Sequence, residues 1–231
     1  MNLTVVLPTK NEAGTIGDLI DRVREECDTL GTEYEILVMD AGSSDQTREI
    51  AEQKGARVDV QKRIGYAGAI LDALDAAQGE RVLTIDADFS HPPRFIRSLW
   101  AVRDFSDLAI ASRFVSGGKA DMDMMRYTLS RVLNLTFRLL TRTPVFDLSS
   151  GYRLYKKDLM ARYKFEGENL SILQDMVVKL HANGHTVMEV PFHYMPRRAG
   201  VSKSQVLKFG PSYLATLWRL FAARITGARL G

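Results

Sequence analysis

The sequence predicts an α/β protein with a doubly wound, mostly parallel β-sheet that is flanked by helices. Short apolar segments rich in β-branched residues alternate with segments of helical periodicity through the first half of the chain. Several apolar segments end in acidic or other polar residues, as strands do at the ligand-binding edge of an open parallel sheet. The chain has 231 residues, of which 45% are hydrophobic and 26% charged, so it can form one large domain with its own core.

The expected elements of the first half follow in regular order. Strands are expected at residues 3–7, 35–39, 57–61, 81–85 and 108–112, and helices at 15–30, 46–54 and 65–77. Pro8 ends the first strand, and Gly79 marks the end of the third helix. Thr15 and Asp45 are placed to cap the first two helices. This alternation implies βαβ units with right-handed crossovers, in a sheet of the nucleotide-binding type.

The second half is expected to contain one long helix, at residues 123–141, and an edge strand at 189–191. Pro191 assigns that strand to an edge because proline cannot donate a hydrogen bond to a neighbouring strand. In the long helix, Arg131, Asn134, Arg138 and Arg142 fall on one face, which is typical of a solvated surface.

The C-terminal segment is predicted to form an amphipathic helix at residues 211–226, beginning at Pro211. Its apolar side consists of Leu214, Trp218, Phe221 and Ile225, widened by Leu217 and Leu220, and its other side of Ser212, Thr216, Arg219 and Ala223. At roughly 24 Å long and with Arg219 in its middle, it is expected to lie in a membrane interface rather than to cross the bilayer. The alternative is packing on the protein's own core or on a partner subunit. The chain is therefore divided into a domain at 1–203 and a helical tail at 204–231.

Composition narrows the functional classes. The net charge of +3 gives no reason to expect a nucleic-acid partner, but the basic residues gather from Arg126 onward, which suits phosphate or an anionic membrane surface. The single cysteine, Cys27, rules out an internal disulfide. No secretory signal is recognisable, and no apolar run reaches the length of a membrane span. We therefore expect a cytoplasmic protein that is peripheral on the cytoplasmic face of a membrane.

The segment most informative about chemistry is 82–93. An apolar strand ends there in Asp86 and Asp88, and Pro92 and Pro93 force a turn after them. Two carboxylates at the carboxyl end of a parallel strand can hold Mg²⁺ or Mn²⁺ against the phosphates of a nucleotide. The same Asp-x-Asp spacing also occurs in ordinary solvated loops, so the motif alone leaves both interpretations open.

Several further segments follow in a fixed order. They are Val-Leu-Pro-Thr-Lys-Asn-Glu at 6–12, Asp-Ala-Gly-Ser-Ser-Asp-Gln-Thr at 40–47, Ser-Arg-Phe at 112–114, Ser-Arg at 130–131, Asp-Leu-Ser-Ser-Gly-Tyr-Arg at 147–153, and the basic segment 197–203. With Asp86-Ala-Asp88, this order resembles the GT-A glycosyltransferases of family 2. The resemblance is strongest to the polyprenyl-phosphate sugar transferases, which include the dolichol-phosphate mannose synthases, and it covers roughly residues 3–203.

The resemblance implies metal-dependent, inverting transfer of a hexose from a nucleotide sugar to the phosphate of a polyprenyl or dolichyl phosphate. Mannose from GDP-mannose is the favoured donor, and Mg²⁺ or Mn²⁺ the expected metal. Because the acceptor is already an anion, the reaction needs cations that align two negative partners rather than a strong general base. The alternative within the family is UDP-glucose or another donor, or a non-lipid saccharide acceptor. A partner subunit could supply a membrane anchor.

The resemblance also assigns roles to residues. The metal ligands would be Asp86, Asp88 and Ser90, and the nucleotide-sugar contacts Pro8, Thr9, Asn11, Glu12, Asp40, Asp86, Ala87, Arg197 and Lys203, with Ser202 in the same basic loop. The acceptor phosphate would be bound by Arg113, Arg126, Ser130 and Arg131, so that the catalytic set is Asp88, Arg113, Arg126 and Arg131. Asp175 would orient sugar or acceptor. Arg153 would either bind substrate or form a structural pair with Asp147.

Two departures from the family pattern leave the base and the sugar open. The family often has a second aspartate where this chain has Ala41, and a glycine where it has Gln46. Other classes fit less well. A nucleotidyltransferase would need a glycine-rich triphosphate loop, for which 10–14 is a poor candidate, and a nicotinamide enzyme would need Gly-x-Gly-x-x-Gly after the first strand. A non-catalytic scaffold would have no reason to keep Asp86, Asp88, Arg113 and Arg131.

Overall fold

The computed structural model describes residues 1–196 and 210–226. The strands are β1 (Leu3–Thr9), β2 (Tyr34–Asp40), β3 (Arg57–Val60), β4 (Arg81–Thr84), β5 (Leu108–Ser112), β6 (Lys119–Ala120), β7 (Arg153–Lys156), β8 (Val187–Pro191) and β9 (His193–Tyr194). The helices are α1 (Ile16–Asp28), α2 (Thr47–Gln53), α3 (Gly65–Ala76), α4 (Ile96–Ala101), α5 (Met124–Thr141), α6 (Lys157–Met160), α7 (Ile172–Ala182) and α8 (Gly210–Thr226), with 3₁₀ turns η1 (Pro93–Phe95) and η2 (Asn169–Ser171).

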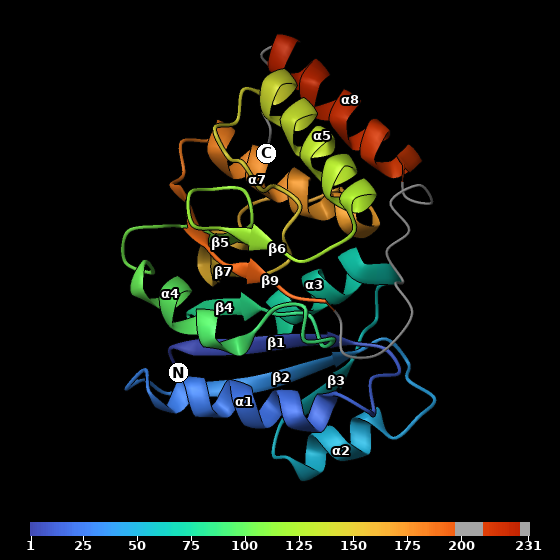
Figure 1. Ribbon diagram of the computed structural model, residues 1–231, viewed down its shortest axis with the longest axis vertical. Helices are drawn as coiled ribbons and strands as arrows, with labels where there is room; N and C mark the ends of the chain where they lie inside the picture. The colour runs from blue at the N-terminus through green and yellow to red at the C-terminus, as the bar shows by residue number, and fades with distance from the viewer. Residues whose placement is uncertain (197–209, 227–231) are drawn as a thin grey trace.

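Seven strands form the central sheet, in the order β3-β2-β1-β4-β7-β5-β8 (Figure 1). Strands β1 to β4 are mutually parallel, and β5 pairs in parallel with β8. β7 is antiparallel to both of its neighbours, β4 and β5. The predicted mostly parallel sheet is confirmed, and the strand at Glu189-Val-Pro191 is indeed at an edge, as Pro191 requires.

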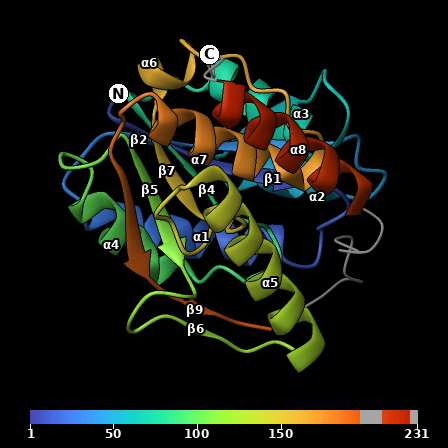
Figure 2. The same cartoon turned by 90° about the horizontal axis from the view of Figure 1, so that it is seen from above.

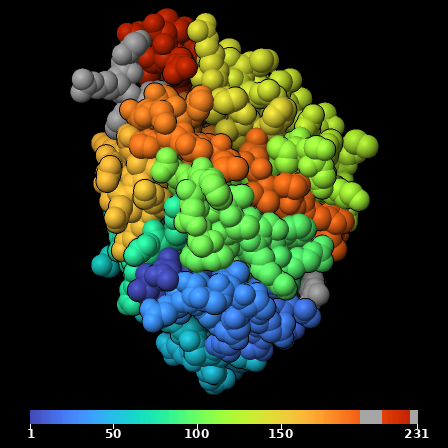
Figure 3. Space-filling model, turned by 90° about the vertical axis from the view of Figure 1, so that its left-hand side faces the viewer, coloured from blue at the N-terminus to red at the C-terminus, as the bar shows by residue number. Residues whose placement is uncertain are grey.

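Helices cover both faces of this sheet, which explains why its strands are apolar almost throughout. Leu3, Val5 and Leu7 of β1 point into a core shared with α1, α2 and α4. Val6, between them, points into the opposite core, which contains residues of α3, α5, α7 and α8. Figure 2 shows the two helix layers from above, and in Figure 3 the N-terminal residues occupy the lower part of the surface and α8 the top.

The C-terminal helix α8 packs on α5 and α7 rather than standing apart from the domain (Figure 1). Tyr213, Leu217 and Leu220 are buried in the same core as α3 and α7. The face that packs on the protein combines Leu217 and Leu220 of the expected apolar side with Thr216 of the expected polar side, whose hydroxyl lies 3.0 Å from the Ser171 hydroxyl. The alternative of packing on the protein's own core therefore describes this face of the helix.

The apolar residues that remain outside on α8 include Leu214, Trp218 and Ile225. They stay exposed although the helix is folded against the domain. Within the described residues, no helix is both long and apolar enough to span a bilayer. The expected boundary between residues 203 and 204 falls outside the described part of the chain.

Candidate active site

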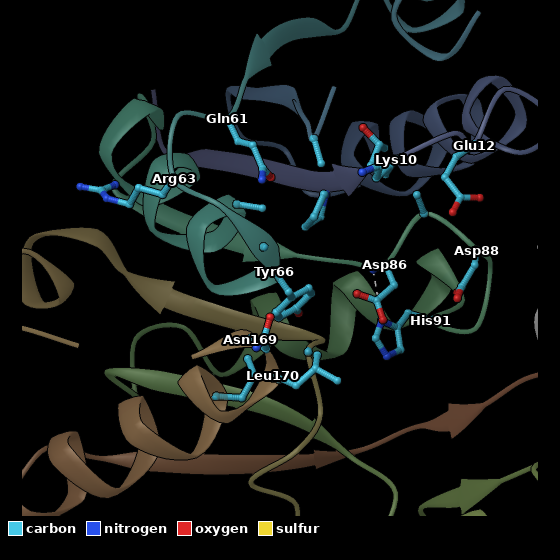
Figure 4. Close-up of a pocket in the computed structure, with 18 of the residues that line it drawn as sticks. Lys10, Glu12, Gln61, Arg63, Tyr66, Asp86, Asp88, His91, Asn169 and Leu170 are labelled. Atoms are coloured by element: carbon cyan, nitrogen blue, oxygen red, sulfur yellow. Dashed lines mark hydrogen bonds and ion pairs between the residues drawn. The ribbon is translucent and has the colours of Figure 1, made fainter. Parts of the chain in front are cut away.

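The carboxyl ends of β1, β2, β3 and β4 meet along one edge of the sheet, and a cavity of about 710 Å³ opens there (Figure 4). Its lining combines four groups: the residues after β1, those after β3 with the start of α3, the Asp-x-Asp turn after β4, and residues of the second half. They include Pro8, Thr9, Lys10, Glu12, Ala41, Gly42, Gln61, Arg63, Tyr66, Asp86, Ala87, Asp88, His91, Arg113, Arg126, Ser149, Asn169, Leu170 and Tyr194.

The Asp-x-Asp turn presents both carboxylates to this cavity. Asp86 is partly exposed, whereas Asp88 is nearly buried and accepts a hydrogen bond of 2.9 Å from the backbone N–H of Ser90. Phe89, which follows Asp88, adopts a left-handed backbone with φ of 63°, so the chain turns directly after the second carboxylate. The Ser90 hydroxyl is buried and does not belong to the described cavity lining, so its role as a third metal ligand stays a prediction.

His91 is a cavity residue that the sequence did not single out. Its Nδ1 accepts a hydrogen bond of 3.2 Å from the backbone N–H of Asp86, so the ring proton lies on Nε2. The imidazole packs among the rings of Tyr152, Phe192 and Tyr194, with centroids 5.3 to 5.9 Å away. This aromatic box joins the Asp-x-Asp turn to β9. The only signal in the sequence was the position of His91 directly after the motif.

At the other end of the cavity, Asp40 does not take the position expected of it. Its carboxylate is fully buried and accepts hydrogen bonds from the backbone N–H groups of Gly42, at 3.0 Å, and Ser43, at 2.8 Å. Arg48 lies 3.9 Å from the same carboxylate. The carboxylate therefore shapes the loop after β2, and the described cavity wall there is formed by Ala41 and Gly42.

Asn11 also joins loops instead of lining the cavity. It has a φ of 55°, its backbone N–H donates to the Ser43 hydroxyl at 2.9 Å, and its side-chain oxygen accepts from the Ser44 N–H at 2.9 Å. Pro8, Thr9 and Glu12 do line the cavity, as expected. The buried Thr9 hydroxyl has no hydrogen-bond partner in the described structure.

The segment from Val60 to Tyr66 was missed as part of the site. It follows β3 and wraps the cavity before α3 begins at Gly65, whose φ of 79° suits glycine. Asp72 of α3 holds this segment by accepting from the backbone N–H of Arg63 at 2.8 Å and from its guanidinium at 2.7 Å. The sequence showed a strand followed by a helix here but gave no sign of how closely the connection approaches the carboxylates.

Arg113 forms a buried ion pair with Asp147 on the second-half side of the cavity. Its Nε and Nη2 donate to the two carboxylate oxygens at 2.8 and 2.7 Å, in bidentate geometry. Although burial alone raises the pKa of Asp147, the adjacent guanidinium holds that pKa below its ordinary value. Asp147 thereby fixes the plane of the Arg113 guanidinium, and Arg113 belongs to the cavity lining.

Other expected acceptor residues gather around Arg113 to different degrees. Ser130 of α5 lies 3.4 Å from Arg113 Nη2, and Arg126 lines the cavity one turn earlier. Arg131 instead stacks on the Phe114 ring, 5.0 Å from its centroid, and does not belong to the described cavity lining. Asn134 is buried and donates to the Ser149 hydroxyl at 2.9 Å. The face of α5 that looked solvated therefore turns in part toward the site.

Arg153 and Asp175 have structural contacts that differ from their expected ones. Arg153 is fully buried and donates to the carbonyl oxygens of Leu148, Ser150 and Leu173, at 2.6, 2.6 and 2.9 Å, so it is structural but is not paired with Asp147. Asp175 is also fully buried. It accepts from the backbone N–H of Glu166 at 2.6 Å and from Arg219 at 3.0 Å, which ties α7 to α8 rather than to a ligand.

Glu189 of β8 supports the Arg113–Asp147 pair from behind. Its carboxylate oxygens accept from the backbone N–H groups of Phe146 and Asp147 at 2.8 and 2.9 Å, and burial raises its pKa above the ordinary value. We expect Glu189→Ala to lower the free energy of unfolding by about 2–3 kcal/mol, because two N–H groups lose a charged acceptor. Glu189→Gln keeps one carbonyl acceptor and should lose less. Urea unfolding of both variants measures the difference, and equal stability of Ala and Gln would contradict it.

The basic loop of Arg197, Ser202 and Lys203 lies outside the described residues. The described residues do not form a complete metal site without a substrate. Within residues 1–196 and 210–226, no three His, Cys, Asp or Glu side chains lie close enough together to bind one metal ion. Asp86 and Asp88 nevertheless suit Mg²⁺ or Mn²⁺, which is commonly held by one or two carboxylates with substrate phosphates completing its shell.

Comparison with known proteins shows the family. The sequence profile described as Glycosyl transferase family 2 matches residues 4–164. A polyprenol monophosphomannose synthase from Mycolicibacterium smegmatis is 33% identical over 214 residues, which cover 86% of this chain and 79% of that protein. A dolichol-phosphate mannosyltransferase from Pyrococcus furiosus is 30% identical over 212 residues. These cover 88% of this chain but only 59% of the Pyrococcus protein.

A solved structure shows the same fold. The glucosyl-3-phosphoglycerate synthase from Mycobacterium tuberculosis, crystallised with Mn²⁺, uridine diphosphate and glucosyl-3-phosphoglycerate, superposes with a TM-score of 0.76. The match covers 96% of this chain and 80% of that chain at 22% identity, and it confirms the GT-A architecture alone. With the family profile over residues 4–164 and these mannosyltransferase relatives, the chain belongs to glycosyl transferase family 2 and is a glycosyltransferase.

Proposed function

We propose that this glycosyltransferase transfers a hexose, with mannose from GDP-mannose as the favoured donor, to the phosphate of a polyprenyl or dolichyl phosphate with inversion at C1. One observation supports this most strongly. A single cavity brings the Asp86 and Asp88 carboxylates together with the oriented Arg113 guanidinium and with Arg126. Such a site can bind two phosphorylated substrates at once, one at each end, and compensate the negative charges of both.

The donor end is formed by the residues that follow β1, β3 and β4. The nucleoside would lie along Pro8, Thr9 and Gln61, with its diphosphate toward Asp86 and Asp88. Asp86 and Asp88 would hold Mg²⁺ or Mn²⁺, whose positive charge would stabilise the leaving nucleotide. Asp86 is held in place by its backbone hydrogen bond to His91.

The acceptor end is formed by Arg113, Arg126 and Ser130. The acceptor phosphate is an anion, so one of its oxygens attacks C1 of the hexose without a general base. The new bond between that oxygen and C1 forms as the bond between C1 and the diphosphate oxygen breaks, and the electron pair leaves with the nucleoside diphosphate. The Arg113 guanidinium, fixed by Asp147, holds the attacking phosphate in line.

The test is transfer of radiolabelled sugar into an organic phase, with a panel of nucleotide sugars, a short polyprenyl phosphate and Mg²⁺ or Mn²⁺. Lipid product from GDP-mannose that disappears with a chelator is the expected result. Lipid product from UDP-glucose instead would overturn GDP-mannose as the donor and would support the proposed polyprenyl-phosphate acceptor. Metal-dependent donor hydrolysis without any lipid product would overturn the polyprenyl-phosphate acceptor.

We further propose that α5 and α8 rest together on an anionic membrane surface, which brings the lipid acceptor to the site and agrees with action on the cytoplasmic face. Their exposed apolar residues are Met124, Met125, Val132, Leu135, Leu139 and Leu140 on α5, and Leu214, Trp218 and Ile225 on α8. The two helices are in contact, and neither contains an aspartate or glutamate, whereas both contain arginines. Apolar side chains with basic neighbours and no acidic ones fit anionic headgroups.

The combined change Leu139→Glu and Trp218→Glu is expected to weaken binding to phosphatidylglycerol vesicles at least about tenfold, because these side chains are 65% and 70% exposed and would be buried in the lipid. Vesicle flotation measures it. Phe105→Glu is the matched control. Phe105 is 72% exposed, but it lies between α4 and β5 and so belongs to neither α5 nor α8. Equal loss with the control, or none with the double variant, would contradict the membrane face.

A further inference from the structure

We propose that the side chains of Tyr66 and Asn169 form hydrogen bonds with the hydroxyl groups of the donor hexose and so determine the sugar selectivity of this enzyme. This inference rests on the proposed transfer of a sugar from a nucleotide sugar. It concerns two cavity residues, one at the start of α3 and one in η2, that lie outside the motifs of the family. Figure 4 shows both side chains in the cavity beside Asp86.

The first residue, Tyr66, has its hydroxyl next to the metal-binding carboxylate. A Cβ added to Gly151 would lie 2.6 Å from the Tyr66 hydroxyl and 3.5 Å from Asp86 Oδ1, so these two oxygens flank the same point. Gly151 keeps that point clear. Within the described part of the chain, the Tyr66 hydroxyl has no hydrogen-bond partner, although the ring itself packs against the core. A phenol hydroxyl can donate a hydrogen bond to a sugar oxygen and accept one from a sugar hydroxyl.

The second residue, Asn169, lies against the same wall. Its Oδ1 is 3.2 Å from the position where a Cβ on Gly65 would lie, one residue before Tyr66. Its backbone has a φ of 48°, a left-handed conformation that few side chains other than asparagine accept. The amide faces the cavity and has no partner among the described residues, so two donors and one acceptor are available to hydroxyl groups.

The segment around Asn169 is held firmly on its far side. Asp175 accepts from the backbone N–H groups of Glu166 and Gly167, at 2.6 and 3.2 Å. Arg219 of α8 bridges Asp175 and Glu166 at 3.0 and 2.8 Å. Gly167 lies so close to Ile172 that an added Cβ would be 2.5 Å from its backbone, which excludes other residues. A segment fixed in this way can present Asn169 without reordering on binding.

The position of the pair identifies the part of the donor that it meets. The hexose is bonded directly to the diphosphate, and the diphosphate is expected at Asp86 and Asp88. Tyr66 and Asn169 flank Asp86 on the side away from Asp88 and from the expected nucleoside position. We therefore expect these two side chains to lie beside the sugar ring. Sites that hydrogen-bond a substrate hydroxyl discriminate well against an epimer that misplaces it, because their buried polar groups are then left without partners.

The test compares Tyr66→Phe and Asn169→Gly with the wild type. Glycine keeps the left-handed backbone at 169 and removes only the amide, and phenylalanine removes only the hydroxyl. For each variant we would measure kcat/KM with GDP-mannose and GDP-glucose, which share base and diphosphate, and the affinity for GDP in the presence of Mg²⁺. Phe105→Ala is the control, since Phe105 is 72% exposed and does not belong to the cavity lining.

The expected result is that each variant narrows the ratio of kcat/KM between the two sugars by about tenfold, as the loss of one substrate hydrogen bond does, while its affinity for GDP stays within about twofold of the wild type. An unchanged ratio, or an equal loss of affinity for GDP, would overturn the assignment. If the wild type transfers no sugar to lipid, the proposed acceptor fails. The pair is then judged by whether the variants weaken binding of GDP-mannose more than that of GDP.

Discussion

Replacing Asp88 by Asn is expected to slow sugar transfer by about a thousandfold or more, the largest effect of any single change in this chain. Asp88 is nearly buried at the carboxyl end of β4, where only Asp86 offers a second carboxylate in the same turn. Asparagine keeps the shape and can still accept from the Ser90 N–H, but it removes the charge that holds the divalent cation. The measurement is kcat in the lipid transfer assay over a range of Mn²⁺ concentrations.

Two controls make this result specific. Asp18→Asn removes an exposed carboxylate on α1, far from the cavity, and should leave the rate unchanged. The melting temperature of Asp88→Asn should not fall, since a neutral amide costs less to bury than a carboxylate. Wild-type activity in the Asp88→Asn variant would show that Asp88 does not hold the metal.

Breaking the Arg113–Asp147 pair is expected to give the second largest effect, and this effect includes stability. Asp147→Asn leaves the buried Arg113 with a neutral partner, and such losses cost about 3–5 kcal/mol of unfolding free energy. Arg113→Lys keeps the charge but cannot donate in bidentate geometry, so transfer should fall steeply while more of the stability remains. Denaturant unfolding and kcat/KM for the lipid acceptor, measured on both variants, test this division. Equal stability losses would contradict it.

The effect of Asp147 should depend on pH in a defined direction. Burial alone raises the pKa of this carboxyl, but Arg113 outweighs it and holds the pKa below the ordinary value. The ion pair therefore contributes fully above the pKa of aspartate in the unfolded chain, about 3.9, and is lost as the pH falls through the lower folded value. The stability difference between wild type and Asp147→Asn should be full at pH 7 and shrink below about pH 4. A difference that grows on acidification would contradict the sign.

The first half of the fold was predictable because local pattern and tertiary structure agree there. Residues 3–9 and 34–40 are apolar runs with clear stops, and both sheet faces are covered, so periodicity alone identifies them. β7 was missed because Arg153 opens it, and a charged residue in a central strand argues against burial. The guanidinium is satisfied there by three carbonyl groups of other segments. Such partners come from tertiary structure and leave no local signal.

The site was predictable to the extent that a motif marks it. Asp86, Asp88, Arg113 and Arg126 all line the cavity, as the family pattern implied. The sequence could not show which side of a residue faces the ligand: Asp40 stands at the right strand end, but its carboxylate turns into the loop after β2. His91 was missed because its contacts are with the rings of Tyr152, Phe192 and Tyr194, more than 60 residues away along the chain.

The bond between Arg219 and Asp175 limits how enzymes of this kind can be recombined. Asp175 lies in α7, within the domain, whereas Arg219 belongs to the last described helix. A hybrid that joins the first 203 residues to the C-terminal segment of a relative would leave the buried Asp175 carboxylate with Lys179, 3.5 Å away, as its remaining described cation. Segment exchange should therefore be made after Thr226, so that α8 stays with the helices α5 and α7 on which it packs.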